Sequence, residues 1–195
     1  MANILDELEP KTYNGAKVSP NWEEWDAAFE AEMSSFKENN VWDIVPRPAG
    51  RKVVGGRWVC KIKRDAQGEI ERFKARYVAK GFTQIQGLDY DETFAPVVRF
   101  DSLRLLLAIS AAKKWKPRQL DIKTAFLYGI LNEEIYMELP EGYRIGNHVA
   151  KLNRCIYGLK QSPRNWYFRL TEYIIPLGFF LPLLILVSSS TTKDI

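Results

Sequence analysis

The side chains best suited to bind a ligand are basic residues that alternate with apolar ones between residues 57 and 80. Residues 47–80 carry eleven basic and three acidic side chains, whereas residues 1–46 carry three basic and ten acidic ones. A basic block interleaved with aromatic residues suits a surface that binds nucleic acid. Two alternatives stay open: the lysines only keep a two-stranded ribbon soluble, or the acidic first segment pairs with the basic block.

A single carboxylate stands out further along the chain. Asp121 lies near the end of a short strand that we expect at residues 118–123. From the residues alone, an aspartate there is either a turn or cap residue or a ligand for a cation. Its neighbours do not decide between these functions.

Other chemistries are limited by the residue types that the chain contains. His148 is the one histidine among 195 residues, which excludes a His-rich zinc site and a pair of zinc-binding histidines. Cys60 and Cys155 lack a metal-binding spacing, so we expect reduced thiols in a cytoplasmic or nuclear protein. The acidic N-terminus does not resemble a signal peptide. The apolar run at 173–187 is too short and too rich in proline for a membrane span.

The basic side chains fall within the clearest secondary-structure signal of the chain. Residues 57–80 alternate apolar and basic side chains on both sides of Asp65-Ala-Gln-Gly68, which is typical of an antiparallel hairpin. Such a hairpin has one basic and one apolar face. We expect its basic side chains to be largely exposed: Lys61, Lys63, Arg72, Lys74 and Arg76.

Helices and short strands alternate around this hairpin. Ser19-Pro20 predicts the start of a helix that ends at Asn39-Asn40, and Ser162-Pro163 predicts the start of another. The apolar stripes of these two helices are Trp22, Trp25, Phe29, Met33 and Phe36, and Trp166, Leu170, Tyr173 and Leu177. A third helix is expected at 101–115, capped by Asp101, with Leu103, Leu106, Leu107 and Ser110 inside. Further strands are expected at 118–123, 134–139 and 149–153. The predicted class is mixed α/β, of the α+β type.

Several sequence blocks, taken together in order and spacing, resemble the reverse transcriptase domain of copia-type long-terminal-repeat retrotransposons. The resemblance runs from about Trp22 to Gly178. Its blocks are Trp25, Ala28 and Glu32, Asn40 to Trp42, Lys74 to Gln84, Asp89 to Pro96, Gln119 to Leu127, Glu134 to Met137, and Tyr157 to Arg164.

This resemblance implies a right-hand polymerase whose fingers contain the basic hairpin and whose first palm motif contains Asp121. Enzymes of that family transfer a nucleotide from a deoxynucleoside triphosphate to a primer on an RNA or DNA template. Two Mg²⁺ or Mn²⁺ ions, held by carboxylates, stabilise the attacking and leaving oxygens. The resemblance therefore makes Asp121 the expected catalytic and metal-binding residue.

Further sites are implied residue by residue. Lys74 and Arg76 resemble the cations that grip the triphosphate, and the backbone amides of Thr124, Ala125 and Phe126 would face it. Phe126 resembles the aromatic side chain that excludes a ribose 2′-hydroxyl, although an ordinary core phenylalanine gives the same pattern. Gly158 stands where the backbone approaches the nucleotide. The template or primer would contact the remaining hairpin cations, which are Arg57, Lys61, Lys63 and Arg72.

One family motif is missing from the chain. The third palm motif, an aromatic residue followed after one position by Asp-Asp, has no counterpart in the sequence. We therefore expect a truncated, inactive reverse transcriptase with fingers and an incomplete palm. The alternatives are a non-catalytic nucleic-acid-binding module and an inert product of a degenerate element. The expected regions are an acidic segment with a helix (1–45), the basic hairpin region (46–100), a partial palm (101–178) and an unrelated apolar tail (179–195).

Overall fold

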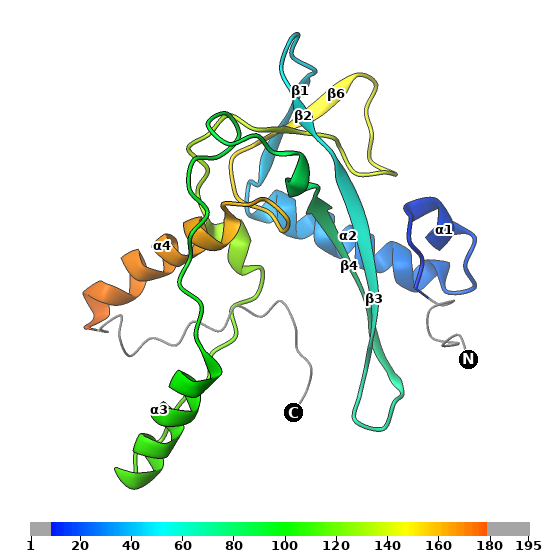
Figure 1. Ribbon diagram of the computed structural model, residues 1–195. Coiled ribbons are helices and arrows are strands. Elements are labelled where there is room, and N and C mark those ends of the chain that lie inside the picture. Colours follow the sequence, from blue (N-terminus) through cyan, green and yellow to red (C-terminus); the bar gives the residue numbers. More distant parts are fainter. Residues whose placement is uncertain (1–8, 179–195) are drawn as a thin grey trace.

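The computed structural model describes residues 9–178, which form helices and strands in alternation (Figure 1). The expected mixed α/β class is confirmed for this range. The tail predicted at 179–195 lies outside the described residues. Within residues 9–178, no helix is long and apolar enough to cross a membrane.

A long antiparallel hairpin forms where the alternating pattern predicts it. β3 (Gly56–Arg64) pairs with β4 (Ile70–Ala79), and the register places Trp58 opposite Tyr77. The carboxylate of Asp65 accepts hydrogen bonds from two backbone N–H groups of the turn, which fixes the turn locally. The buried side chains of the apolar face are Trp58, Cys60, Ala75, Tyr77 and Ala79.

The first long helix covers the apolar face of the hairpin. α1 (Tyr13–Lys17) precedes α2 (Trp22–Glu38), which packs along β4. Trp25, Phe29 and Phe36 of its predicted stripe are buried, and the Phe29 ring lies 4.6 Å from the Trp58 ring. The expected cap lies slightly outside the helix: the Ser19 hydroxyl accepts a hydrogen bond from the N–H of Asn21, and α2 begins after Asn21.

A small sheet lies at the end of the hairpin that is opposite its turn. Its order is β1 (Trp42–Pro46), β6 (His148–Leu152), β5 (Tyr136–Met137) and β2 (Val53–Val54). β2 and β5 are parallel, and the other neighbours are antiparallel. The sequence predicted strands near β5 and β6, but it did not predict β1 or β2. The sheet anchors residues 129–156 to the segment that leads into the hairpin.

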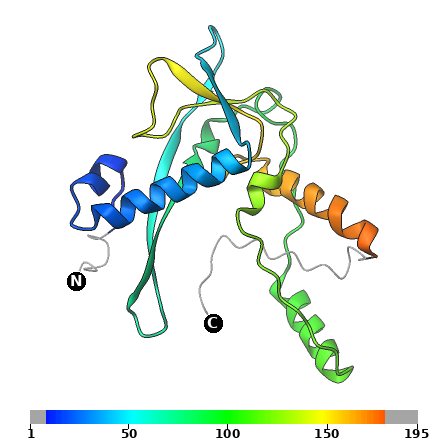
Figure 2. The same cartoon turned by 180° about the vertical axis from the view of Figure 1, so that it is seen from behind.

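A third helix projects from the rest of the chain in both views (Figures 1 and 2). α3 (Phe100–Ala112) begins after Arg99, so Asp101 lies in its first turn rather than at its cap. Of its predicted inner side, Ser110 is buried, but Leu107 is 47% exposed because no other helix or strand of residues 9–178 packs extensively against α3. The strand predicted at 118–123 is wrong: these residues pair with no strand among residues 9–178.

The last described helix begins as the Ser-Pro signal predicts. α4 (Ser162–Ile174) has its proline in the first turn. Its predicted apolar stripe is correct only near the start, since Trp166 is half-buried whereas Tyr173 and Leu177 are exposed. Among residues 9–178 there are also three short 3₁₀ turns: η2 (Gly81–Thr83), η3 (Ala125–Tyr128) and η4 (Ile175–Leu177).

Candidate nucleic-acid interface

The predicted basic face of the hairpin is present, but it is less exposed than the alternating pattern suggests. Arg57, Lys61 and Arg72 are exposed, whereas Lys63, Lys74 and Arg76 are half-buried. For Arg76 the reason is the loop before α4, whose Tyr157 ring lies under the guanidinium. The expectation that these cations are largely exposed is therefore wrong for Lys63, Lys74 and Arg76.

The register brings like charges together on this face. Lys61 lies opposite Lys74, and Lys63 lies opposite Arg72. Cross-strand pairs of like charge are unfavourable unless counter-charges are near. Burial is the largest cause that lowers the pKa of Lys74, followed by the charges of Arg76 and Arg72. The contributions of Arg76 and Arg72 to this lowered pKa reflect the positive charges gathered along the middle of β4.

The acidic first segment supplies part of the counter-charge, as one of the alternatives proposed. The carboxylate of Glu9 lies 2.5 Å from the ammonium of Lys61 and accepts a hydrogen bond from the N–H of Ile62. Glu32 on α2 accepts a hydrogen bond from the N–H of Tyr77. Intramolecular pairing therefore exists, but it leaves Arg57 and Arg72 exposed on the same ribbon.

Two predicted site residues from distant parts of the chain, Arg76 and Phe126, both contact the ring of Tyr157. The guanidinium of Arg76 lies over the ring of Tyr157, 4.9 Å from its centroid. The ring of Phe126 meets the same tyrosine edge to face at 4.8 Å. Tyr157 therefore joins strand β4 to the turn that begins at Thr124. Tyr157 lies in one of the blocks that carry the resemblance, but no role for it was predicted from the sequence.

The turn after Asp121 has the backbone form that an anion-binding turn requires. Thr124 has φ +52°, in the left-handed region, and its hydroxyl donates to the carbonyl of Lys123. Ala125 and Phe126 follow as the first residues of η3. The first amides of such a turn have no partner within the turn itself. The geometry is thus compatible with the predicted role of these amides, which stays a prediction.

Gly158 is required by a close approach of two backbones. Its φ is +93°, and a Cβ atom there would lie 2.2 Å from the carbonyl oxygen of Ala79. The N–H of Ala79 in turn donates to the carbonyl of Tyr157 at 2.8 Å. The loop before α4 is therefore seated on the end of β4, close to Arg76. Packing against β4 is enough to explain the glycine, and its predicted contact with a nucleotide stays a prediction.

A buried polar cluster fixes the same loop, and sequence reasoning missed it. The Gln84 side chain accepts a hydrogen bond from the N–H of Lys160 at 2.8 Å and donates to Gln161 at 3.0 Å. Gln161 donates to the carbonyl of Asp89, and the ammonium of Lys52 lies 3.4 Å from the Asp89 carboxylate. The only local signal for this cluster was one glutamine in each of two blocks that carry the resemblance, Gln84 and Gln161. Asp89 thus has a structural role here.

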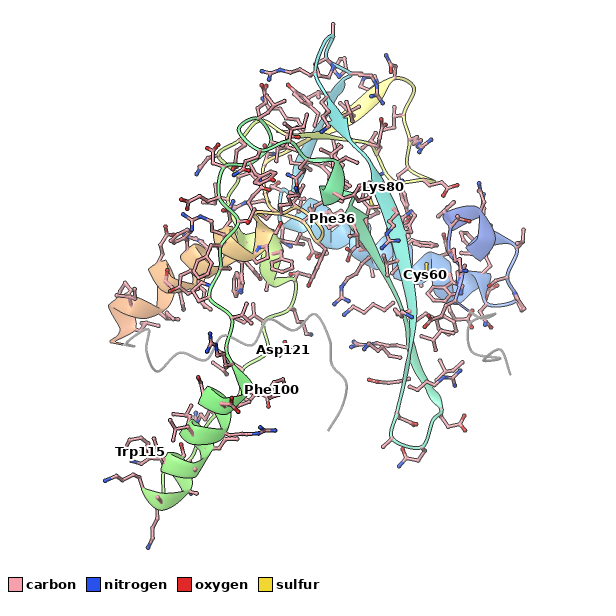
Figure 3. The ribbon with its side chains drawn as sticks, in the orientation of Figure 1. Phe36, Cys60, Lys80, Phe100, Trp115 and Asp121 are labelled. Atoms are coloured by element: carbon pink, nitrogen blue, oxygen red, sulfur yellow. The ribbon has the colours of Figure 1, made fainter. Side chains whose placement is uncertain are left out.

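Asp121 lies apart from these residues. It is exposed, within the segment that returns from α3, and Figure 3 shows it on the arm that carries Phe100. Among residues 9–178, no group of three or more His, Cys, Asp or Glu side chains could hold a metal ion. The described residues therefore do not fit the divalent-ion site that the resemblance implies.

Comparison with known proteins is consistent with the resemblance. Residues 39–183 match the family model described as "Reverse transcriptase (RNA-dependent DNA polymerase)". The chain is 41% identical, over 88% of its length, to the retrovirus-related Pol polyprotein from transposon TNT 1-94 of Nicotiana tabacum. It is also 41% identical, over 91% of its length, to the corresponding polyprotein from transposon RE1 of Arabidopsis thaliana.

The matched segment is a small part of those relatives. The chain spans 13% of the tobacco polyprotein and 12% of the Arabidopsis one. An uncharacterized mitochondrial protein of Arabidopsis thaliana is 37% identical over 52% of this chain and 58% of its own length. No solved structure matches the chain.

Proposed function

Because the chain belongs to the reverse transcriptase (RNA-dependent DNA polymerase) family, we propose that its described residues form the fingers and part of the palm of a copia-type enzyme. In this proposal the hairpin β3–β4 holds the template or primer through Arg57, Lys61, Lys63 and Arg72. Lys74, Arg76, the 124–126 turn and Gly158 hold the incoming deoxynucleoside triphosphate. The proposed partners are therefore an RNA or DNA template-primer and a nucleotide.

The observation that carries the proposal is the cluster of Arg76, Tyr157 and Phe126. Two residues assigned to the same nucleotide, one on the hairpin and one on η3, both contact a single tyrosine. Fifty positions separate Arg76 from Phe126 in the sequence, so only the folded chain can bring them together. This proximity supports the assignment of both residues to one site.

We do not propose that residues 9–178 by themselves carry out metal-dependent phosphoryl transfer. In the intact family Mg²⁺ or Mn²⁺ supports phosphoryl transfer. Asp121 is the proposed first carboxylate, but the described residues bring no second one beside it. For this chain alone, the second candidate is therefore a nucleic-acid-binding module without catalysis. The exposed cations on the hairpin and the missing metal cluster within residues 9–178 favour it.

A salt titration tests nucleic-acid binding directly. We would measure the anisotropy of a fluorescent RNA–DNA primer-template with the whole chain between low and physiological salt. Phosphate contacts make the logarithm of the binding constant fall steeply with the logarithm of salt concentration. The double variant Lys61→Gln/Arg72→Gln should reduce that slope by about one to two units.

A second double variant controls for the loss of charge. Lys113→Gln/Lys114→Gln removes two exposed cations from the end of α3, away from the hairpin. It should leave the slope close to that of the parent chain. Equal losses for both double variants would place binding outside the hairpin, and no salt-dependent binding would favour an inert chain.

A further inference from the structure

The outer edges of the hairpin are covered by specific acceptors. On β3 the N–H of Ile62 donates to the Glu9 carboxylate at 2.9 Å. On β4 the N–H of Tyr77 donates to Glu32 Oε1 at 3.3 Å, and the N–H of Ala79 donates to the Tyr157 carbonyl. An uncovered edge N–H would remain available to other chains. Glu32 thus belongs to the contacts that set where the end of β4 lies.

Glu32 stands next to the proposed nucleotide-binding pair in the fold. α2 crosses the hairpin and packs against β4 (Figure 1), and the residue that donates to Glu32 directly follows Arg76. Glu32 lies before residue 39, outside the segment that matches the family model. The hydrogen bond therefore connects α2 to the strand that carries Lys74 and Arg76.

The buried position of Glu32 disfavours a charged hydrogen-bond acceptor. Burial raises the pKa of Glu32 to about 7, against the hydrogen bond from Tyr77 and the charges of Arg76 and Lys74, which lower it. A neutral amide could accept the same hydrogen bond without the penalty for burying a charge. The charge of Glu32 raises the pKa of Lys74, whereas Arg76, Arg72 and Lys63 lower it. The carboxylate and the hairpin cations thus act on one another.

We propose that Glu32 positions the Lys74–Arg76 segment of β4 and that the charge of its carboxyl group sets how tightly these cations hold phosphate. The inference rests on the proposed function of the hairpin. In the ionised state Glu32 competes with a bound phosphate for the positive charge of Lys74 and Arg76. In the neutral state Glu32 still accepts the hydrogen bond from the N–H of Tyr77. It then no longer offsets the positive charges of Lys74 and Arg76, which can attract the phosphate in full.

The proposal predicts a pH-dependent affinity for a ligand whose own charge is constant. The charged groups that act on Glu32 from β4 are Arg76 and Lys74, with Arg72 and Lys63 acting on Lys74. A twelve-residue oligodeoxythymidylate is a suitable probe, since its phosphodiesters keep their charge between pH 5.5 and 8.5. It can reach Lys74 as well as the cations proposed for the template or primer, because Lys74 lies opposite Lys61 on the same face of the hairpin. Affinity of the whole chain should fall across this range at fixed low salt.

Glu32→Gln is the central variant because it keeps an acceptor and removes the charge. Its affinity for the oligonucleotide should equal that of the parent chain near pH 5.5. It should exceed the parent's by about threefold at pH 8.5, the effect expected of one charge several ångströms away in a high-dielectric setting. Glu32→Ala, which also removes the acceptor, should bind more weakly than Glu32→Gln at every pH.

Glu38→Gln is the matched control. Glu38 is exposed at the end of the same helix, so its removal changes the net charge equally without touching β4. This variant should follow the pH profile of the parent chain. If Glu32→Gln also follows that profile, or if Glu38→Gln shows the same gain, the inference is overturned. If the parent chain shows no salt-dependent binding, the proposed function fails instead, and the inference falls with it.

Discussion

The guanidinium of Arg76 lies over the ring of Tyr157, with 4.9 Å between its central carbon and the ring centroid. Arg76 belongs to the hairpin, and Tyr157 belongs to the loop before α4. The contact holds a long cationic side chain against a ring that Phe126 also contacts. A guanidinium held in this way loses less conformational entropy when it binds a phosphate.

Tyr157→Ala should weaken both folding and nucleotide binding. The variant removes a cation–π contact and an aromatic contact, together worth about 1–3 kcal/mol. Tyr157→Phe keeps the ring and should retain most of this stability and the affinity for a deoxynucleoside triphosphate. Urea denaturation and isothermal titration would measure the two effects. A phenylalanine variant as defective as the alanine variant would contradict the stacking role.

Gly158→Ala should destabilise the chain by about 2–4 kcal/mol. The residue has φ +93°, and an added Cβ would lie 2.2 Å from the Ala79 carbonyl, so both backbone strain and a steric clash contribute. Gly87→Ala is the control, because Gly87 has φ +80° but no heavy atom within 4 Å of the added Cβ. It should cost only about 1 kcal/mol. Urea midpoints give the comparison, and equal losses would rule out the close approach to β4.

Stability should decrease as the pH rises through the titration of Glu32. The pKa of Glu32 is raised from 4.5 to about 7 in the folded chain. Between these values the folded state keeps a proton that the unfolded state has released, so the free energy of unfolding falls as pH increases. The total loss is at most about 3 kcal/mol and is complete above pH 7.

Glu32→Gln isolates this contribution. Its free energy of unfolding should lack the decline between pH 4.5 and 7, so that the variant becomes more stable than the parent chain at pH 8. Thermal or urea unfolding at half-unit pH steps would measure the difference. A parent chain and variant whose profiles run parallel would show that the carboxyl group of Glu32 titrates normally.

A protein of these 195 residues should not extend a primer. The sequence contains no Asp-Asp pair, and the described residues offer no metal-binding cluster around Asp121. Since a displacement of about 1 Å already costs on the order of a hundredfold in rate, loss of the second pair of carboxylates should abolish turnover. The assay is primer extension on an RNA template with Mg²⁺ or Mn²⁺. Asp121→Asn is the control, and extension that only the parent chain supports would refute the expectation.

Local patterns in the sequence determined several elements of this fold. The hairpin at 56–79 follows from strict alternation around a turn whose aspartate bonds its own backbone. The helix at 22–38 follows from aromatic residues three and four positions apart. Both signals depend on neighbours a few residues away, and the chain supplies them regardless of the rest of the fold. The family followed from the order of several such blocks.

Tertiary structure alone decided where the candidate site lies. A strand needs a partner, and the segment at 118–123 has none among residues 9–178, so its apolar pattern did not make it a strand. The meeting of Arg76 with Tyr157, and of Glu32 with the N–H of Tyr77, joins residues 81 and 45 positions apart. Such contacts depend on how α2, β4 and the loop before α4 pack together. Packing is a property of the whole chain, which no local pattern of residues contains.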